Sequence, residues 1–145
     1  MEHEDSYPLG MYTCSMDEKG RLKFPADFRL FLGEGARCFA TTVDRKTLRI
    51  YCQPQWQTVQ ERVGGPSSKG QLVADFAREL GNECQLDSQG RITICSELRQ
   101  ALGIGSDTFY LLWRRDHIEA LSSAQNRERR AGRASQHVSE ASDMK

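Results

Sequence analysis

The sequence lacks any long apolar run. The longest one, from Phe109 to Trp113, is far shorter than the roughly 20 residues that a membrane-spanning helix needs. The first ten residues, MEHEDSYPLG, are acidic and contain no apolar stretch, so no signal peptide is expected there. We therefore expect a cytoplasmic protein with no membrane partner.

The chain also lacks the spacings that mark metal and catalytic sites. Its five cysteines include no CxxC pair, and most occupy inward positions where cysteine serves as a small hydrophobic residue. Buried structural thiols are the favoured interpretation, and metal-binding or redox roles stay open. The three histidines are scattered, no Ser or Cys is paired with a base, and GGPSSKG (64–70) lacks the P-loop spacing. The sequence thus predicts no enzyme, no metal, no cofactor and no small-molecule substrate.

Neither sign of charge dominates, since 20 Lys and Arg face 20 Asp and Glu. This balance argues against a protein that coats nucleic acid, but one local basic patch could still bind it. With 38% hydrophobic and 28% charged residues, a chain of 145 residues is expected to form one globular domain or two small units sharing a core.

What the sequence does contain is a repeat. A shift of 70 residues aligns positions 14–48 with 84–118 without a gap, and ten of the 35 aligned pairs are identical. Each copy predicts two short strands around a turn, one amphipathic helix and a further strand or hairpin. Pro25 and Ser96 are expected to start the two helices, and Gly33 and Gly103 to end them in the left-handed conformation. The inward positions are Cys14, Met16, Leu22, Phe24, Phe28, Phe31 and Leu32 in the first copy, and Cys84, Leu86, Ile92, Ile94, Leu98, Ala101 and Leu102 in the second.

The turn itself, MDEKGRL (16–22) and again LDSQGRI (86–92), suits a type I turn followed by a glycine bulge. Asp17 and Asp87 can accept bonds from N–H groups of the turn, while Gly20 and Gly90 supply a positive φ. Such turns are common in hairpins without any function, but turn chemistry does not explain the arginine. Charge differs between the copies: the first hairpin carries Lys19, Arg21 and Lys23, where the second has Gln89, Arg91 and Thr93.

The pattern in DEKGRLKFPADFR, its repeat DSQGRITICSELR and the segment PQWQTVQERV between them resemble the MraZ family of bacterial transcriptional regulators, relatives of AbrB and MazE. The resemblance runs from about Leu9 to Leu121. It implies a mainly β fold with short helices (α+β), in which two tandem repeats form an intrachain swapped-hairpin, AbrB-like β barrel. The expected parts are an N-terminal extension (1–8), the first repeat (9–63), a connecting segment with a helix (64–82), the second repeat (83–121) and a polar, Arg-containing tail (122–145), partly disordered.

The same resemblance implies sequence-specific binding of double-stranded DNA at promoter direct repeats of the division and cell-wall gene cluster. It also implies a ring-shaped homo-oligomer. Because the resemblance implies DNA binding, the protein is expected to be associated with the nucleoid. By motif position it implicates Asp17, Lys19 and Arg21, and Asp87 and Arg91. The charge pattern adds Lys23, and Gln89 stands where the family has a basic residue, which weakens the second hairpin. The expected DNA contacts are therefore Lys19, Arg21, Lys23, Gln89 and Arg91, with Asp17, Gly20, Asp87 and Gly90 orienting the turns.

A second function, a protein-interaction module of antitoxin (MazE-like) type, stays open. It would require a long tail that wraps a partner. The tail here is polar, with Arg127, Arg129, Arg130 and Arg133 and few apolar anchors, which is more typical of a solvated or DNA-assisting segment.

Overall fold

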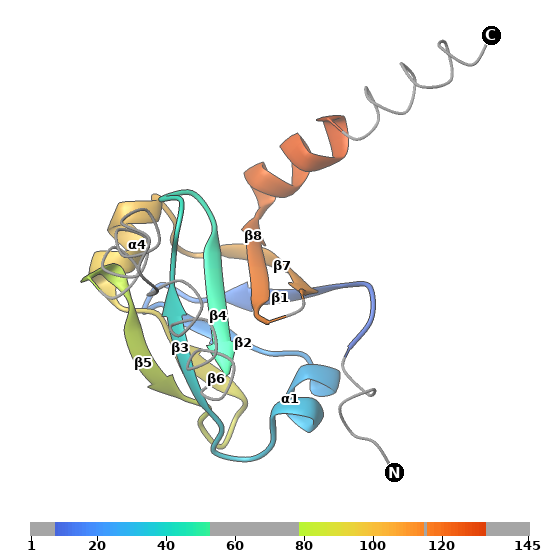
Figure 1. The fold of residues 1–145 in the computed structure, drawn as a ribbon, viewed down its shortest axis with the longest axis vertical. Coiled ribbons are helices and arrows are strands. Elements are labelled where there is room, and N and C mark those ends of the chain that lie inside the picture. Colours follow the sequence, from blue (N-terminus) through green and yellow to red (C-terminus); the bar gives the residue numbers. More distant parts are fainter. Residues whose placement is uncertain (1–7, 53–78, 115, 133–145) are drawn as a thin grey trace, which may run out of the picture.

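A computed structural model describes residues 8–52, 79–114 and 116–132 (Figure 1). Eight antiparallel strands form one sheet in the order β5-β3-β4-β8-β7-β1-β2-β6, which curls into a nearly closed barrel. The strands are β1 (Met11–Met16), β2 (Arg21–Lys23), β3 (Arg37–Thr41), β4 (Leu48–Cys52), β5 (Asn82–Gln85), β6 (Arg91–Thr93), β7 (Asp107–Trp113) and β8 (Ile118–Ser122). The helices are α1 (Ala26–Leu32), α4 (Ser96–Leu102) and a helix over 123–132 that leads away from the barrel (Figure 1).

The structure preserves the 70-residue repeat element by element. Strand β6, helix α4 and strand β8 each begin and end 70 residues after β2, α1 and β4, respectively. The halves also exchange strands, because β1 pairs with β7 of the second half while β5 pairs with β3 of the first. At the centre β2 pairs with β6, with Leu22 opposite Ile92. The predicted fold, a mainly β barrel built from two swapped repeats, is confirmed.

The predicted core is largely correct. The residues just before and after each turn that were expected to point inward are at most 5% exposed: Met16, Leu22, Phe24, Leu86, Ile92 and Ile94. Phe28 and Leu98 anchor the two helices in this core with no exposed surface. Cys14, Leu32, Cys84 and Leu102 are partly buried against it. Ala101, by contrast, is exposed, because only one residue of this short helix reaches the centre of the barrel.

Two details of the helix ends differ from expectation. Helix α4 begins one residue earlier than a Ser96 cap requires: Cys95 is the N-cap, in the same extended conformation as Pro25, and Ser96 is the first helical residue. Gly103 is left-handed as predicted, whereas Gly33 has φ 91° and ψ 157° and leads into a turn in which Ala36 N donates to the carbonyl oxygen of Gly33. The N-cap of α4 thus lies at the position equivalent to the N-cap of α1, 70 residues later, although Ser96 has the better capping side chain.

Several predictions fall outside the described residues: the N-terminal extension up to residue 7, the end of the first repeat (53–63), most of the connecting segment (64–78) and the tail from 133. In the part of the chain that the structure describes, no helix is long and apolar enough to cross a membrane.

Candidate nucleic-acid interface

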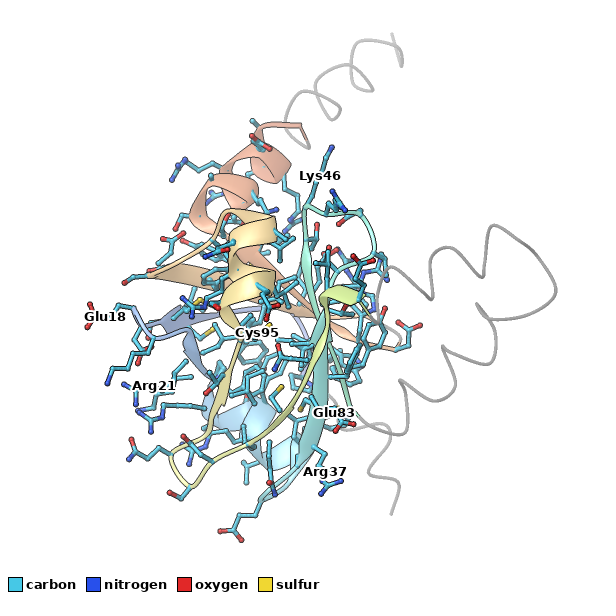
Figure 2. All side chains as sticks on the ribbon, turned by 90° about the vertical axis from the view of Figure 1, so that its left-hand side faces the viewer. Glu18, Arg21, Arg37, Lys46, Glu83 and Cys95 are labelled. Carbon is cyan, nitrogen blue, oxygen red and sulfur yellow. The ribbon has the colours of Figure 1, made fainter. Side chains whose placement is uncertain are left out.

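The first hairpin projects from one side of the barrel, where Glu18 and Arg21 lie (Figure 2). Its turn is closed by two backbone bonds, from Gly20 N to Asp17 O and from Asp17 N to Arg21 O, both 3.0 Å long. Gly20 has φ +84°, which glycine adopts without strain. The Oδ1 atom of Asp17 accepts bonds from the backbone N–H groups of Lys19 (3.0 Å) and Arg21 (2.9 Å). These bonds have the pattern of a type I turn followed by a glycine bulge.

The second hairpin has the same geometry. Gly90 N donates to Asp87 O at 3.0 Å and Asp87 N to Arg91 O at 2.9 Å, while Gly90 has φ +78°. The Oδ1 atom of Asp87 accepts bonds from the backbone N–H groups of Gln89 and Arg91, both at 2.9 Å. Asp and Gly therefore build one turn twice, whatever residues lie between them.

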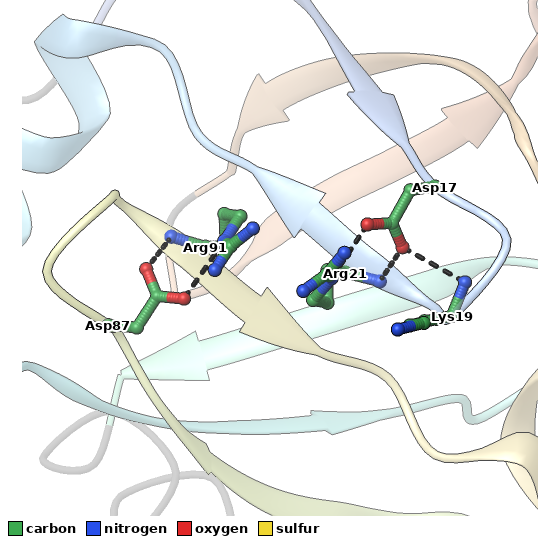
Figure 3. A network of polar contacts seen from close by, with 5 residues as sticks. All are labelled: Asp17, Lys19, Arg21, Asp87 and Arg91. Atoms are coloured by element: carbon green, nitrogen blue, oxygen red, sulfur yellow. Dashed lines mark hydrogen bonds and ion pairs between the residues drawn. The ribbon is translucent and has the colours of Figure 1, made fainter.

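Each aspartate also holds the arginine four residues later (Figure 3). The Nε–H of Arg21 donates to Asp17 Oδ2 at 2.6 Å, and that of Arg91 to Asp87 Oδ2 at 2.9 Å. The pKa of each aspartate is lowered, mainly by the bond from the backbone N–H of the arginine and also by the bond from its side chain. Both carboxylates are therefore charged at neutral pH. Because the aspartate occupies Nε, the four donors on the terminal nitrogens of each guanidinium are not used by this contact.

The structure joins the two hairpins into one surface, which the sequence did not predict. In the β2–β6 ladder Lys23 lies directly opposite Arg91, and Arg21 lies opposite Thr93. Alternation places these residues on the outer face of the sheet, opposite the buried Leu22 and Ile92. Like charges at opposed positions destabilise a sheet, and the ion pair of Arg91 with Asp87 offsets this repulsion.

Two further arginines contact this surface. A side chain at Gly20 would collide with Arg99 of α4, and one at Gly90 would collide with Arg29 of α1, so each helix packs on the hairpin of the other half. Arg99 Nε also donates to the carbonyl oxygen of Ile94 at 3.0 Å. Both arginines are half-buried. They occupy equivalent positions of the two repeats, a signal in the sequence that the predictions did not use. We call the resulting surface the hairpin platform: its cationic residues are Lys19, Arg21, Lys23, Arg29, Arg91 and Arg99, against the carboxylates of Asp17, Glu18 and Asp87.

The geometry thus places four of the predicted contact residues, Lys19, Arg21, Lys23 and Arg91, on the platform. Gln89, at the tip of the second hairpin, is exposed but uncharged. Within the described residues, no group of three or more His, Cys, Asp or Glu could hold a metal ion.

Comparison with known proteins gives the family. A family model described as "MraZ protein, putative antitoxin-like" matches residues 9–73. The protein named transcriptional regulator MraZ of Nitrosomonas eutropha is 35% identical over 100 residues, which cover 66% of this chain and 68% of the relative. The protein of the same name from Herpetosiphon aurantiacus is 35% identical over 119 residues, covering 72% and 79%, respectively. The chain belongs to the MraZ family of transcriptional regulators.

MraZ transcriptional regulators are not enzymes, in agreement with the sequence. The match to the MraZ family model includes the first hairpin and ends before the second. In this MraZ chain the second hairpin is therefore assigned by the internal repeat and by its geometry, which is that of the first.

Proposed function

We propose that the chain regulates transcription by binding double-stranded DNA through the hairpin platform. The observation that carries this proposal is the β2–β6 ladder, which sets Arg21, Lys23 and Arg91 side by side on one outward face. A two-stranded β ribbon fits the major groove of DNA, and an arginine can donate two bonds to one guanine there. Asp17 and Asp87 orient the arginines from behind, since a carboxylate facing DNA would be repelled by phosphate.

The charge balance of the chain fits local rather than general binding. The platform concentrates cations on a protein whose formal net charge is zero, so each subunit makes few phosphate contacts. Selective binding then requires several subunits on several DNA repeats, each raising the effective concentration of the next. We propose a ring-shaped homo-oligomer on promoter direct repeats of the division and cell-wall gene cluster, and hence a cytoplasmic, nucleoid-associated protein.

The test measures, by fluorescence anisotropy, the binding of the full-length protein to DNA from upstream of its own gene. We expect Arg21→Ala to weaken binding by roughly 1–3 kcal/mol per contact, about 5- to 150-fold in Kd, and to relax selectivity at one base pair. The control is Lys46→Ala, which removes one exposed positive charge from the β3–β4 loop, away from both hairpins (Figure 2). Equal binding by Arg21→Ala and Lys46→Ala would contradict a role for the platform.

The antitoxin-like alternative predicts a different outcome. In a pull-down with the full-length chain, one stoichiometric protein partner would be recovered, and promoter DNA would not bind with selectivity. Light scattering on the same preparation measures the oligomeric state, and a monomer would contradict the ring.

A further inference from the structure

Three of the five cysteines form a row across neighbouring strands. In the sheet, Cys38 of β3 lies opposite Cys52 of β4 and, on its other side, opposite Cys84 of β5. Directly opposed residues point to the same face, so the three thiols are neighbours across β4, β3 and β5. Cys95 lies outside this row, at the start of α4 (Figure 2). Cys14, in contrast, lies opposite Phe109.

The contacts distinguish one pair within the row. The neighbouring Cys52 side chain lowers the pKa of the Cys38 thiol, while burial opposes this shift. The Sγ of Cys84 instead donates to the backbone carbonyl of Cys38 at 3.7 Å, and burial raises the pKa of Cys84 to about 12. The sulfur of Cys84 is thus directed at the backbone of β3, which leaves Cys52 as the partner of the Cys38 thiol across the sheet.

The backbone geometry allows these two cysteines to be linked. Opposed residues of an antiparallel pair have Cα atoms about 4.5–5.5 Å apart, within the roughly 4.4–6.8 Å that disulfides span. In general, the Cβ atoms of opposed residues are about 4.5–5.5 Å apart, slightly more than in a relaxed disulfide, so we expect a strained bond that is readily reduced.

We propose that Cys38 and Cys52 are a redox-modification site that forms a reversible cross-strand disulfide in the presence of a peroxide. One thiolate attacks a peroxide oxygen, the O–O bond breaks, and a sulfenic acid and hydroxide form. The thiol of the other cysteine then attacks that sulfur, the S–S bond forms, and the sulfenic oxygen leaves as water. Two thiols lose two electrons and two protons in total, and one hydrogen peroxide is reduced to two waters. A dithiol reductant reverses the reaction.

The site can be tested on the full-length wild-type protein, because trypsin places every cysteine on a separate peptide. Cys38 lies in CFATTVDR (38–45), Cys52 in IYCQPQWQTVQER (50–62) and Cys84 in ELGNECQLDSQGR (79–91). After treatment with hydrogen peroxide we expect peptides 38–45 and 50–62 to be linked within one chain, two fewer titratable thiols, and recovery of both with dithiothreitol. Cys52→Ala should abolish the link, and the matched control Cys14→Ala should retain it.

Three oxidation products would overturn the proposal. These are a disulfide between peptides 38–45 and 79–91, a disulfide that joins two chains, and a sulfinic acid with no linked peptide. All of them are read from the wild-type protein, so a variant that fails to fold does not affect the conclusion. An unchanged thiol count at peroxide concentrations that oxidise an unfolded sample of the same chain would equally overturn it.

Discussion

The two hairpins have the same backbone and different charges. Both turns are closed by the same pairs of bonds, both aspartates accept from the same two N–H positions, and both hold the following arginine through Nε. Yet the first carries Lys19 and Lys23 where the second carries Gln89 and Thr93. Within a duplicated fold, the residues that build the turn have stayed fixed while those that face outward have diverged.

The difference separates the roles of the residues. Asp and Gly are required wherever the turn is made, because the carboxylate satisfies its backbone N–H groups and the glycine supplies the positive φ. The two lysines contribute nothing to that geometry, which the second hairpin achieves without them. Their presence in the first hairpin is therefore best explained by what the platform binds.

The largest effect is expected from the turn glycines, which meet different neighbours in the two halves. A Cβ at Gly20 would lie 2.5 Å from Arg99 Nε and 2.6 Å from the backbone carbonyl oxygen of Ile94, which cannot move easily, whereas the three atoms nearest to a Cβ at Gly90 all belong to the Arg29 side chain. Adding the strain of positive φ, we expect Gly20→Ala to lower the free energy of unfolding by about 3 kcal/mol and Gly90→Ala by about 1–2 kcal/mol. Urea denaturation measures both, and equal losses would show that the backbone contact does not matter.

The arginines should differ in the same direction when DNA binding is measured. Arg21 has 36% of its side chain exposed and two lysines on its own hairpin, while Arg91 has 24% exposed and none. We expect Arg21→Ala to cost about 1 kcal/mol more binding free energy than Arg91→Ala, about fivefold in Kd. Anisotropy titrations at one fixed salt concentration give the ratio. A larger loss for Arg91→Ala would reverse the ranking of the hairpins.

Much of this could be predicted from the sequence, because it depends on local patterns. The strands around each turn follow from alternation over a few residues, as the burial of Met16, Leu22 and Phe24 shows. The turns follow from Asp and Gly at fixed positions. The repeat then extends each assignment to the other half without a gap.

What could not be predicted depends on contacts between the halves. The ladder that sets Lys23 beside Arg91 joins residues 68 apart in the chain, and no pattern within either hairpin specifies it. The packing of Arg99 on Gly20 is similarly non-local, although the arginine shared by both repeats pointed to a common role. The sequence predicted a basic first hairpin and a separate second hairpin that keeps only Arg91, where the structure has one platform.

A gain of charge at the second hairpin should make the two halves more alike. Gln89→Lys restores the cation that Lys19 provides in the first hairpin, at a position whose backbone N–H already bonds to Asp87. We expect tighter DNA binding at low salt and a plot of log K against log salt that is steeper by about one unit. Ala124→Lys, an exposed position on the helix over 123–132, adds the same charge elsewhere. The same steepening in both variants would mean that total charge, and not the platform, determines binding.

The smallest expected effect tests whether the turns are equivalent in acid. The backbone N–H of the following arginine is the main cause that lowers the pKa of both Asp17 and Asp87 below the ordinary 3.8. As the pH falls, these aspartates take up protons in the unfolded chain before they do so in the folded chain. Their contribution to the free energy of unfolding is therefore complete above about pH 3.8 and is lost as the pH falls through the lower, folded-state pKa.

Asp17→Asn and Asp87→Asn should each flatten this acid limb of the stability curve, and by equal amounts, because the bonds to the two carboxylates match. Urea unfolding from about pH 4.5 down to about pH 2.5 measures the slope. Glu18→Gln, at an exposed acid of the same turn, is the matched control. Unequal slopes for the two asparagine variants would show that the hairpins differ in geometry as well as in charge, and the asymmetry in DNA binding could then no longer be attributed to the lysines alone.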